Sequence, residues 1–203
     1  MRPAPDGKRC LELGSGVGPR PLGWLTTELE PAEGALKLDA SQPFPIADQT
    51  FDYAYSRHMI EHLSFAAGRF MPRERFRILK PGGTIRIVTP SIGFPLELFA
   101  SEKSPHFERY IEWATETFVP DAPKPMPSFV FNNFVRAWGH TFIYDRTTLE
   151  LILIEAGFAA IRKRDIGKSD HPNPRNLEAE DRMPAGFLAL ESMILEATRP
   201  LSG

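Results

Sequence analysis

Residues 10–18 read Cys-Leu-Glu-Leu-Gly-Ser-Gly-Val-Gly, and this stretch decides the fold. The apolar residues of 8–13 predict a short buried strand that runs straight into a turn with glycine at every second position. Glycine adopts positive φ easily and lets a ligand approach the backbone closely. Because the spacing is G-x-G-x-G, without the G-x-G-x-x-G of dinucleotide enzymes, the turn alone leaves a ligand site and a tight structural turn both open.

Further strands and helices alternate along the chain. Helical spacing of apolar residues predicts a helix over 58–79, and Asp145 is a good N-cap for a second helix that Gly157 closes. Strands are predicted at 23–27, 35–38, 51–55, 84–89, 158–166 and 190–197. Strands that alternate with helical crossovers predict an α/β fold, with a sheet that carries helices on both faces.

The segment 91–144 differs from the rest of the chain, because it is rich in aromatic residues and prolines. We expect it to form an insertion of short helices after the fifth strand, within a single domain that covers residues 1–203. A chain of this length buries about 70% of its unfolded surface, which is enough for one core.

Composition excludes several functional classes. The chain has 203 residues, with 24 Lys and Arg against 26 Asp and Glu, and a net charge of -2, so nucleic acid is not the default partner. No apolar run approaches the roughly 18 residues of a membrane span, and Cys10 has no second cysteine with which to form a disulfide. These features predict a cytoplasmic protein that acts on a small molecule.

Two acids follow the next two predicted strands. Glu28 and Asp39 each stand at the end of a strand, so both carboxylates are expected at the same edge of the sheet as the glycine turn. There they could accept hydrogen bonds from ribose hydroxyls and an exocyclic amine. Taken singly, such acids are also common as solvated residues at strand ends.

Five stretches together resemble the successive motifs of class I S-adenosylmethionine-dependent methyltransferases. They are residues 11–18, 39–45, 50–53, 61–63 and 78–83. The resemblance covers about residues 8 to 90 and is greatest to small bacterial methyltransferases of the type 11-like group, some of which lie near genes of glycan or cell-surface biosynthesis. It implies a Rossmann-like, mostly parallel sheet and S-adenosyl-L-methionine as the cofactor.

The resemblance also implies roles for single residues. The turn from Gly14 through Ser15 and Gly16 to Gly18 would line the methionine and ribose parts of the cofactor. The other implied contacts are with the ribose hydroxyls for Glu28, the adenine amine for Asp39, the adenine edge for Ala40, the methionine end for Ser56 and, indirectly, the ammonium group for Glu12.

The chain departs from the family in two places. Family members usually have a full helix after the glycine turn, but Pro19 and Pro21 leave no room for one before the next strand. Only about seven residues precede the first predicted strand, so we expect the N-terminal helices that often cover this cofactor to be absent. We therefore expect segment 91–144 to close over the cofactor and to carry acceptor specificity.

We expect the methyl group to meet the acceptor near His58, Glu61 and His62. Their i, i+3, i+4 spacing would place these side chains on one face of a helix. Ubiquinone-type O-methyltransferases place E-x-x-E-H here and bind a divalent ion, but His58 replaces the first Glu of that pattern. The group leaves three interpretations open: it binds a metal ion, His58 is a general base, or the side chains pack and shape the cofactor site. We expect no metal ion, and we single out His140 and Tyr144 as the polar groups that face the acceptor opposite His58.

Taken together, the sequence predicts a methyltransferase that uses S-adenosyl-L-methionine to methylate oxygen or nitrogen of a small molecule, such as a sugar or glycan precursor. A nicotinamide-dependent oxidoreductase is the enzyme alternative, which the glycine spacing and the turn at 79–83 disfavour. A non-catalytic module that binds the cofactor for regulation or interaction is the alternative from another class.

Overall fold

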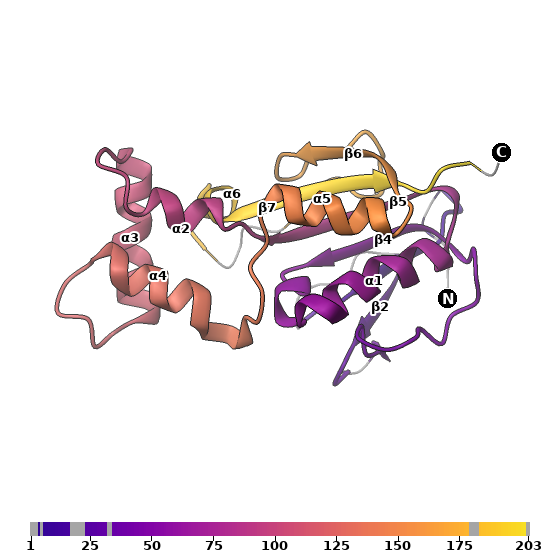
Figure 1. Cartoon of the computed structure of the whole chain (residues 1–203), viewed down its shortest axis with the longest axis horizontal. Helices are drawn as coiled ribbons and strands as arrows, with labels where there is room; N and C mark the ends of the chain where they lie inside the picture. Colours follow the sequence, from indigo (N-terminus) through magenta and orange to yellow (C-terminus); the bar gives the residue numbers. More distant parts are fainter. Residues whose placement is uncertain (1–3, 5, 17–22, 32–33, 179–182, 202–203) are drawn as a thin grey trace.

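The computed structural model describes residues 4, 6–16, 23–31, 34–178 and 183–201. Its centre is a seven-stranded sheet in the order β3-β2-β1-β4-β5-β7-β6, in which β7 runs antiparallel to both of its neighbours (Figure 1). The strands are β1 Cys10–Leu13, β2 Trp24–Glu28, β3 Leu36–Lys37, β4 Phe51–Arg57, β5 Leu79–Pro90, β6 Ala159–Arg164 and β7 Ser192–Thr198. This is the predicted Rossmann-like α/β sheet.

Two long helices cover one face of this sheet. Helix α1 (Phe65–Ile78) and helix α5 (Arg146–Glu155) lie side by side in front of the strands in Figure 1. Their apolar residues pack with alternate residues of β1, β4, β5 and β7 into the main hydrophobic core. The N-cap prediction is confirmed, since Asp145 Oδ1 accepts a hydrogen bond from the Thr148 N–H at 2.7 Å, and Gly157 closes the helix at a φ of 98°.

The opposite face differs from the prediction of helices on both faces. Among the described residues, this face is covered by irregular chain from 165–178 and not by a helix. Arg86 on β5 points into it and forms buried ion pairs with Glu178 and Glu196 at 2.8 and 2.7 Å. The physical reason lies in the connections between β1, β2 and β3, which are too short for the helical crossovers that usually fill this layer.

The insertion forms a separate group of helices at the carboxyl ends of the parallel strands, on the left in Figure 1. It contains α2 (Gly93–Glu97), α3 (Pro105–Phe118), α4 (Pro127–Arg136) and the single-turn helix η2 (Ala137–Gly139). Helices α2, α3 and α4 share a second hydrophobic core with Phe187 of α6 (Phe187–Glu191). The insertion begins and ends at one point, because the Ile92 N–H donates to the Tyr144 carbonyl at 3.0 Å.

The helix predicted over 58–79 begins later. Residues 60–62 form a single-turn helix, η1 (Ile60–His62), and α1 begins only after Ser64, whose hydroxyl accepts a hydrogen bond from the Ala67 N–H at 3.3 Å. At the other end, α1 stops at Ile78 and β5 follows at once, so residues 81–83 belong to the strand. The start is displaced because β4 continues to Arg57 and His58 takes a φ of 46°, which breaks a helix.

Candidate active site

A cavity of about 420 Å³ lies where the carboxyl ends of β1, β4 and β5 meet the insertion. One end of it is the glycine turn and the other is a group of histidines, glutamates and aromatic rings. Its lining residues are Glu12, Gly14, Ser15, Gly16, Arg57, His58, Glu61, His62, Pro90, Trp113, Phe118, Phe134, Trp138, His140, Met183, Leu188 and Glu191. Ligands of open α/β sheets bind at this edge of the strands.

The glycine end of the cavity is shaped by backbone. Gly14 has a φ of 67°, and a Cβ there would lie 2.6 Å from Cγ of Met59. Gly16 has a φ of 61°, and a Cβ there would meet nothing within 4 Å, so its backbone faces open space. The Gly16 N–H donates a hydrogen bond to the Glu28 carboxylate, which ties the end of β2 to the turn. Both positions therefore need glycine, for conformation and, at Gly14, also for space.

The polar groups of this end fit the cofactor that the sequence implies. The Ser15 hydroxyl is buried and has no hydrogen-bond partner among the described residues, although it lines the cavity. Such an orphaned group is satisfied by a bound ligand or by water. Glu12 also lines the cavity, and its carbonyl accepts a hydrogen bond from the Thr27 hydroxyl at 3.1 Å. The predicted contact of Gly18 lies outside the described residues.

Asp39 and Ala40 lie beyond the cavity wall, just after β3. The Leu38 N–H donates to the Glu28 carbonyl at 2.8 Å, so Asp39 and Glu28 stand at the same edge of the sheet. The N–H and the hydroxyl of Ser41 both donate to Asp39 Oδ1, which lowers the pKa of this carboxyl. Asp39 is thus an ionised acceptor next to the glycine turn.

Like Glu28, Asp39 and Ala40, the predicted site residues Ser56 and Tyr144 do not line the cavity. Ser56 is fully buried in β4, and its hydroxyl has no partner within the described part of the chain. Tyr144 is fully buried in the main core, where its hydroxyl lies against Gly68 of α1. The prediction that Tyr144 faces the acceptor is therefore corrected, because the pairing of the insertion's end with Ser91 turns this side chain into the core.

His58 lies at the point where β4 ends, in the strained left-handed region of the backbone. Its Nε2 lies 2.9 Å from the Ser192 hydroxyl and its Nδ1 lies 3.6 Å from Glu61 Oε1. Burial, followed by the charges of Arg57 and of other histidines, lowers the pKa of His58 to about 3. A neutral imidazole of such low basicity is a weak proton acceptor, so a general base at His58 is not supported.

Glu61 is the most deeply buried polar group of the cavity wall. Its Oε2 accepts a hydrogen bond from the Thr89 hydroxyl at 3.1 Å, whereas its Oε1 accepts none from the described residues. Burial raises the pKa of Glu61 to about 8. Because η1 replaces the predicted helix, Glu61, His58 and His62 converge from a strand end and a short turn, not from one helix face.

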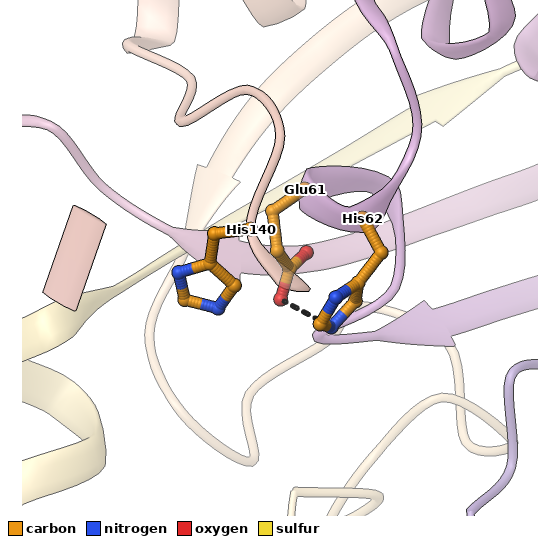
Figure 2. A group of neighbouring side chains, drawn as sticks. All are labelled: Glu61, His62 and His140. Carbon is orange, nitrogen blue, oxygen red and sulfur yellow. Dashed lines mark ion pairs between the residues drawn. The ribbon is translucent and has the colours of Figure 1, made fainter. Parts of the chain in front are cut away.

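His140 joins this group from the insertion (Figure 2). Its Nδ1 lies 2.7 Å from the Phe134 carbonyl, and its ring centre lies 5.3 Å from that of His62. Burial lowers the pKa of His140, so the ring is neutral at neutral pH. The N–H of Thr141, the next residue, donates to the Glu61 carbonyl at 2.7 Å and holds the two segments together.

Sequence reasoning missed Glu191, which ends α6 and lines the cavity. The Tyr110 hydroxyl donates a hydrogen bond to its Oε2, and burial raises the pKa of Glu191 to about 7. The signal in the sequence was a single acid at the start of the apolar stretch 190–197. Since β7 runs antiparallel to β5, the start of β7 meets the carboxyl end of β5 at the cavity.

The sequence profile of the methyltransferase domain family matches residues 1–163, and the chain belongs to this family. This agrees with the fold, with the glycine turn and with the cavity beside it. No curated protein matches the chain significantly. Among the described residues, no helix is both long and apolar enough to cross a membrane.

Solved structures share the fold at low identity. A chain from the complex between the Haloferax volcanii Trm112 methyltransferase activator and a methyltransferase has a TM-score of 0.54 and 14% identity, over 100% of this chain and 85% of that one. An S-adenosylmethionine-dependent methyltransferase from Archaeoglobus fulgidus has a TM-score of 0.54 and 13% identity, over 94% of this chain and 86% of that one. Phosphoethanolamine N-methyltransferase 2 from Haemonchus contortus, in complex with S-adenosyl-L-methionine, gives 0.52 and 16%, over 98% of this chain and 50% of that one.

Proposed function

We propose that this chain is an S-adenosyl-L-methionine-dependent methyltransferase that methylates oxygen or nitrogen of a small-molecule acceptor, such as a sugar or glycan precursor. One observation carries the proposal: a single cavity joins the glycine turn to three histidines and to Glu61 and Glu191. Cofactor and acceptor would therefore share one chamber. Methyl transfer needs this arrangement, because the two reacting atoms must be brought into line.

The glycine end is the proposed cofactor site. Glu28 and Asp39 would accept hydrogen bonds from the ribose hydroxyls and the adenine amine, and the turn of Gly14, Ser15 and Gly16 would lie along the ribose and methionine parts. The remaining proposed contacts are Ala40 with adenine, Glu12 with the ammonium group through an intermediate, and Ser56 with the methionine end from behind the wall. The bound cofactor supplies an electrophilic methyl group on a sulfonium sulfur.

The insertion is the proposed acceptor wall. Trp113, Phe118, Phe134 and Trp138 supply apolar surface that excludes water, and His58 and His140 supply neutral hydrogen-bonding groups. These residues would orient the acceptor oxygen or nitrogen toward the methyl group that the bound cofactor would supply. The proton of the acceptor passes to Glu191, whose pKa of about 7 suits a base at neutral pH.

Two measurements test the proposal. Calorimetry with S-adenosylhomocysteine should give one binding event per chain, whereas NAD should give no heat. Clear binding of NAD with none of S-adenosylhomocysteine would overturn the proposal in favour of an oxidoreductase. Turnover is then followed as S-adenosylhomocysteine release across a panel of sugars, phenols and amines. Binding without turnover on any of them would favour the non-catalytic module.

A cytoplasmic location and a small-molecule partner complete the proposal. Cys10 is free and fully buried, which is compatible with a reducing compartment. The cavity of about 420 Å³ is of the size that small ligands fill.

A further inference from the structure

The acceptor end of the cavity brings three metal-ligating side chains together from two distant segments. Glu61 and His62 come from η1, and His140 comes from the end of the insertion (Figure 2). One ligand atom from each lies within 4.8 Å of the others. The sequence pattern H-x-x-E-H gave no reason to expect the third member, since His140 lies far along the chain.

In each of these side chains, one nitrogen or oxygen atom accepts no hydrogen bond from the described residues, so it can bind a metal ion. A carbonyl oxygen only accepts, so His140 Nδ1 carries the proton that is donated to the Phe134 carbonyl at 2.7 Å. In the neutral ring, Nε2 then holds the lone pair. Backbone carbonyls fix metal-binding histidines in this way.

Glu61 is held in a similar manner. The Thr89 hydroxyl occupies Oε2, while Oε1 is buried and accepts no hydrogen bond within the described part of the chain. Oε1 lies 4.0 Å from His62 Nε2, on the side that the dashed line in Figure 2 marks. A buried carboxylate oxygen without a donor is costly unless a cation or a ligand satisfies it.

We propose that Glu61, His62 and His140 bind one divalent transition-metal ion of the zinc class at the acceptor end of the cavity. Two imidazoles and one carboxylate suit zinc and its neighbours, whereas magnesium and calcium prefer oxygen ligands alone. Three protein ligands leave at least one coordination position open, as in catalytic zinc sites. This replaces the sequence-based expectation of no metal ion.

Loading the site needs only a small movement. Ligand atoms around a tetrahedral zinc lie about 3.3 Å apart, given bonds of roughly 2.0–2.1 Å. His62 has 38% of its side chain exposed and can rotate toward Glu61, whereas His140 and Glu61 are held by the bonds already described. The hydrogen bond from the Thr141 N–H to the Glu61 carbonyl keeps the two segments at this spacing.

All three residues line the cavity, so the open position would face it, and an oxygen of the acceptor bound there would lose its proton more easily. This role toward the acceptor rests on the proposed function, but binding of the ion does not. The ion would hold the acceptor, and Glu191, which lines the same cavity, would receive the proton.

The test uses the full chain, purified without a polyhistidine tag and stripped with a chelator. Titration with Co²⁺ should give one equivalent of bound ion and the visible absorption of low-symmetry cobalt, and Zn²⁺ should displace it. His62→Ala and His140→Ala should each weaken Zn²⁺ binding at least a hundredfold. The matched control is His171→Ala, a histidine on the opposite face of the sheet beside Tyr53, which should bind as the parent protein does.

The outcomes separate this inference from the proposed function. Thermal unfolding of each variant shows that it is folded, and His62→Ala serves if His140→Ala does not fold, since His62 is partly exposed. No stoichiometric Zn²⁺ or Co²⁺ binding, or binding unchanged in the folded variants, would overturn the metal site even if S-adenosylhomocysteine binds normally. Stoichiometric metal with no binding of S-adenosylhomocysteine would support the site and refute the methyltransferase proposal.

Discussion

The two ends of the cavity are built in different ways. At the glycine end, the surface consists of backbone atoms. Gly14 and Gly16 have positive φ, and the Gly16 N–H is hydrogen-bonded to Glu28 at the end of β2. At the acceptor end, the surface consists of side chains: Glu61 is buried, Glu191 is half-buried, and the loss of solvent raises the pKa of both carboxyls. The first end is suited to a fixed ligand that is bound in the same way each time. The second end is suited to proton transfer and to metal binding, and the groups needed for these depend on the chemistry of the acceptor.

The largest expected effect comes from Glu191, and it tests whether the two ends of the cavity have separate roles. Glu191→Gln keeps the shape and the hydrogen bond from Tyr110 but removes the base, so kcat should fall about 10²- to 10⁴-fold. Binding of S-adenosylhomocysteine should change less than threefold, because the change is at the other end. Initial rates and calorimetry measure the two effects, with Glu112→Gln, exposed on α3, as the control. Equal loss of cofactor binding would show that the two ends are not separate.

A second prediction tests the backbone character of the glycine end. Gly14→Ala places a Cβ 2.6 Å from Met59 Cγ, in a conformation that costs alanine roughly 1–2 kcal/mol. We expect the affinity for S-adenosylhomocysteine to fall about a hundredfold, measured by calorimetry. Gly7→Ala is the matched control, because Gly7 also has positive φ but its Cβ would meet nothing within 4 Å. Unchanged affinity in folded Gly14→Ala would refute the proposal that the cofactor lies close to the backbone of the glycine turn.

A third prediction concerns the acid that joins β2 to the turn. Glu28→Ala removes the acceptor of the Gly16 N–H and of the proposed ribose hydroxyls, and should weaken cofactor binding by about 1–2 kcal/mol. Glu30→Ala, two residues further on and exposed, is the control and should bind as the parent does. Calorimetry decides between them, and equal effects of the two changes would remove Glu28 from the site.

The same contrast explains what the sequence could predict. The glycine end is local: the strand over 8–13, the turn after it and the acid at Glu28 follow one another within one stretch, so pattern and spacing were enough. The sheet itself was predictable for the same reason, since each strand carries its own apolar run.

The acceptor end was less predictable because tertiary structure assembles it. Glu191 reaches the cavity only through the antiparallel placement of β7, and His140 reaches Glu61 through the return of the insertion. Tyr144 has the residue type of a site residue, yet the bridge to Ser91 buries it. The start of α1 is displaced because His58 has a positive φ, which breaks a helix. The spacing of apolar residues gives no sign of this conformation.

The last prediction concerns the pH dependence of stability, which tests the environment of Glu191 without a substrate. Glu191 has a pKa of about 7 in the folded chain against a normal value of 4.5, so the folded state holds a proton that the unfolded state releases between these two values. The free energy of unfolding should therefore fall as pH rises from about 4.5 to about 7, and level off above. The whole shift corresponds to roughly 3 kcal/mol at about 1.4 kcal/mol per pH unit, and about 2.5 kcal/mol of it falls between pH 5 and pH 8. Urea unfolding at pH 5 and pH 8 should show this loss in the parent protein, whereas Glu191→Gln, which does not titrate, should lose about 2.5 kcal/mol less over the same interval. A variant whose pH dependence equals that of the parent would show that the Glu191 carboxyl is solvated like an ordinary surface acid, and would leave the acceptor end without its proposed base.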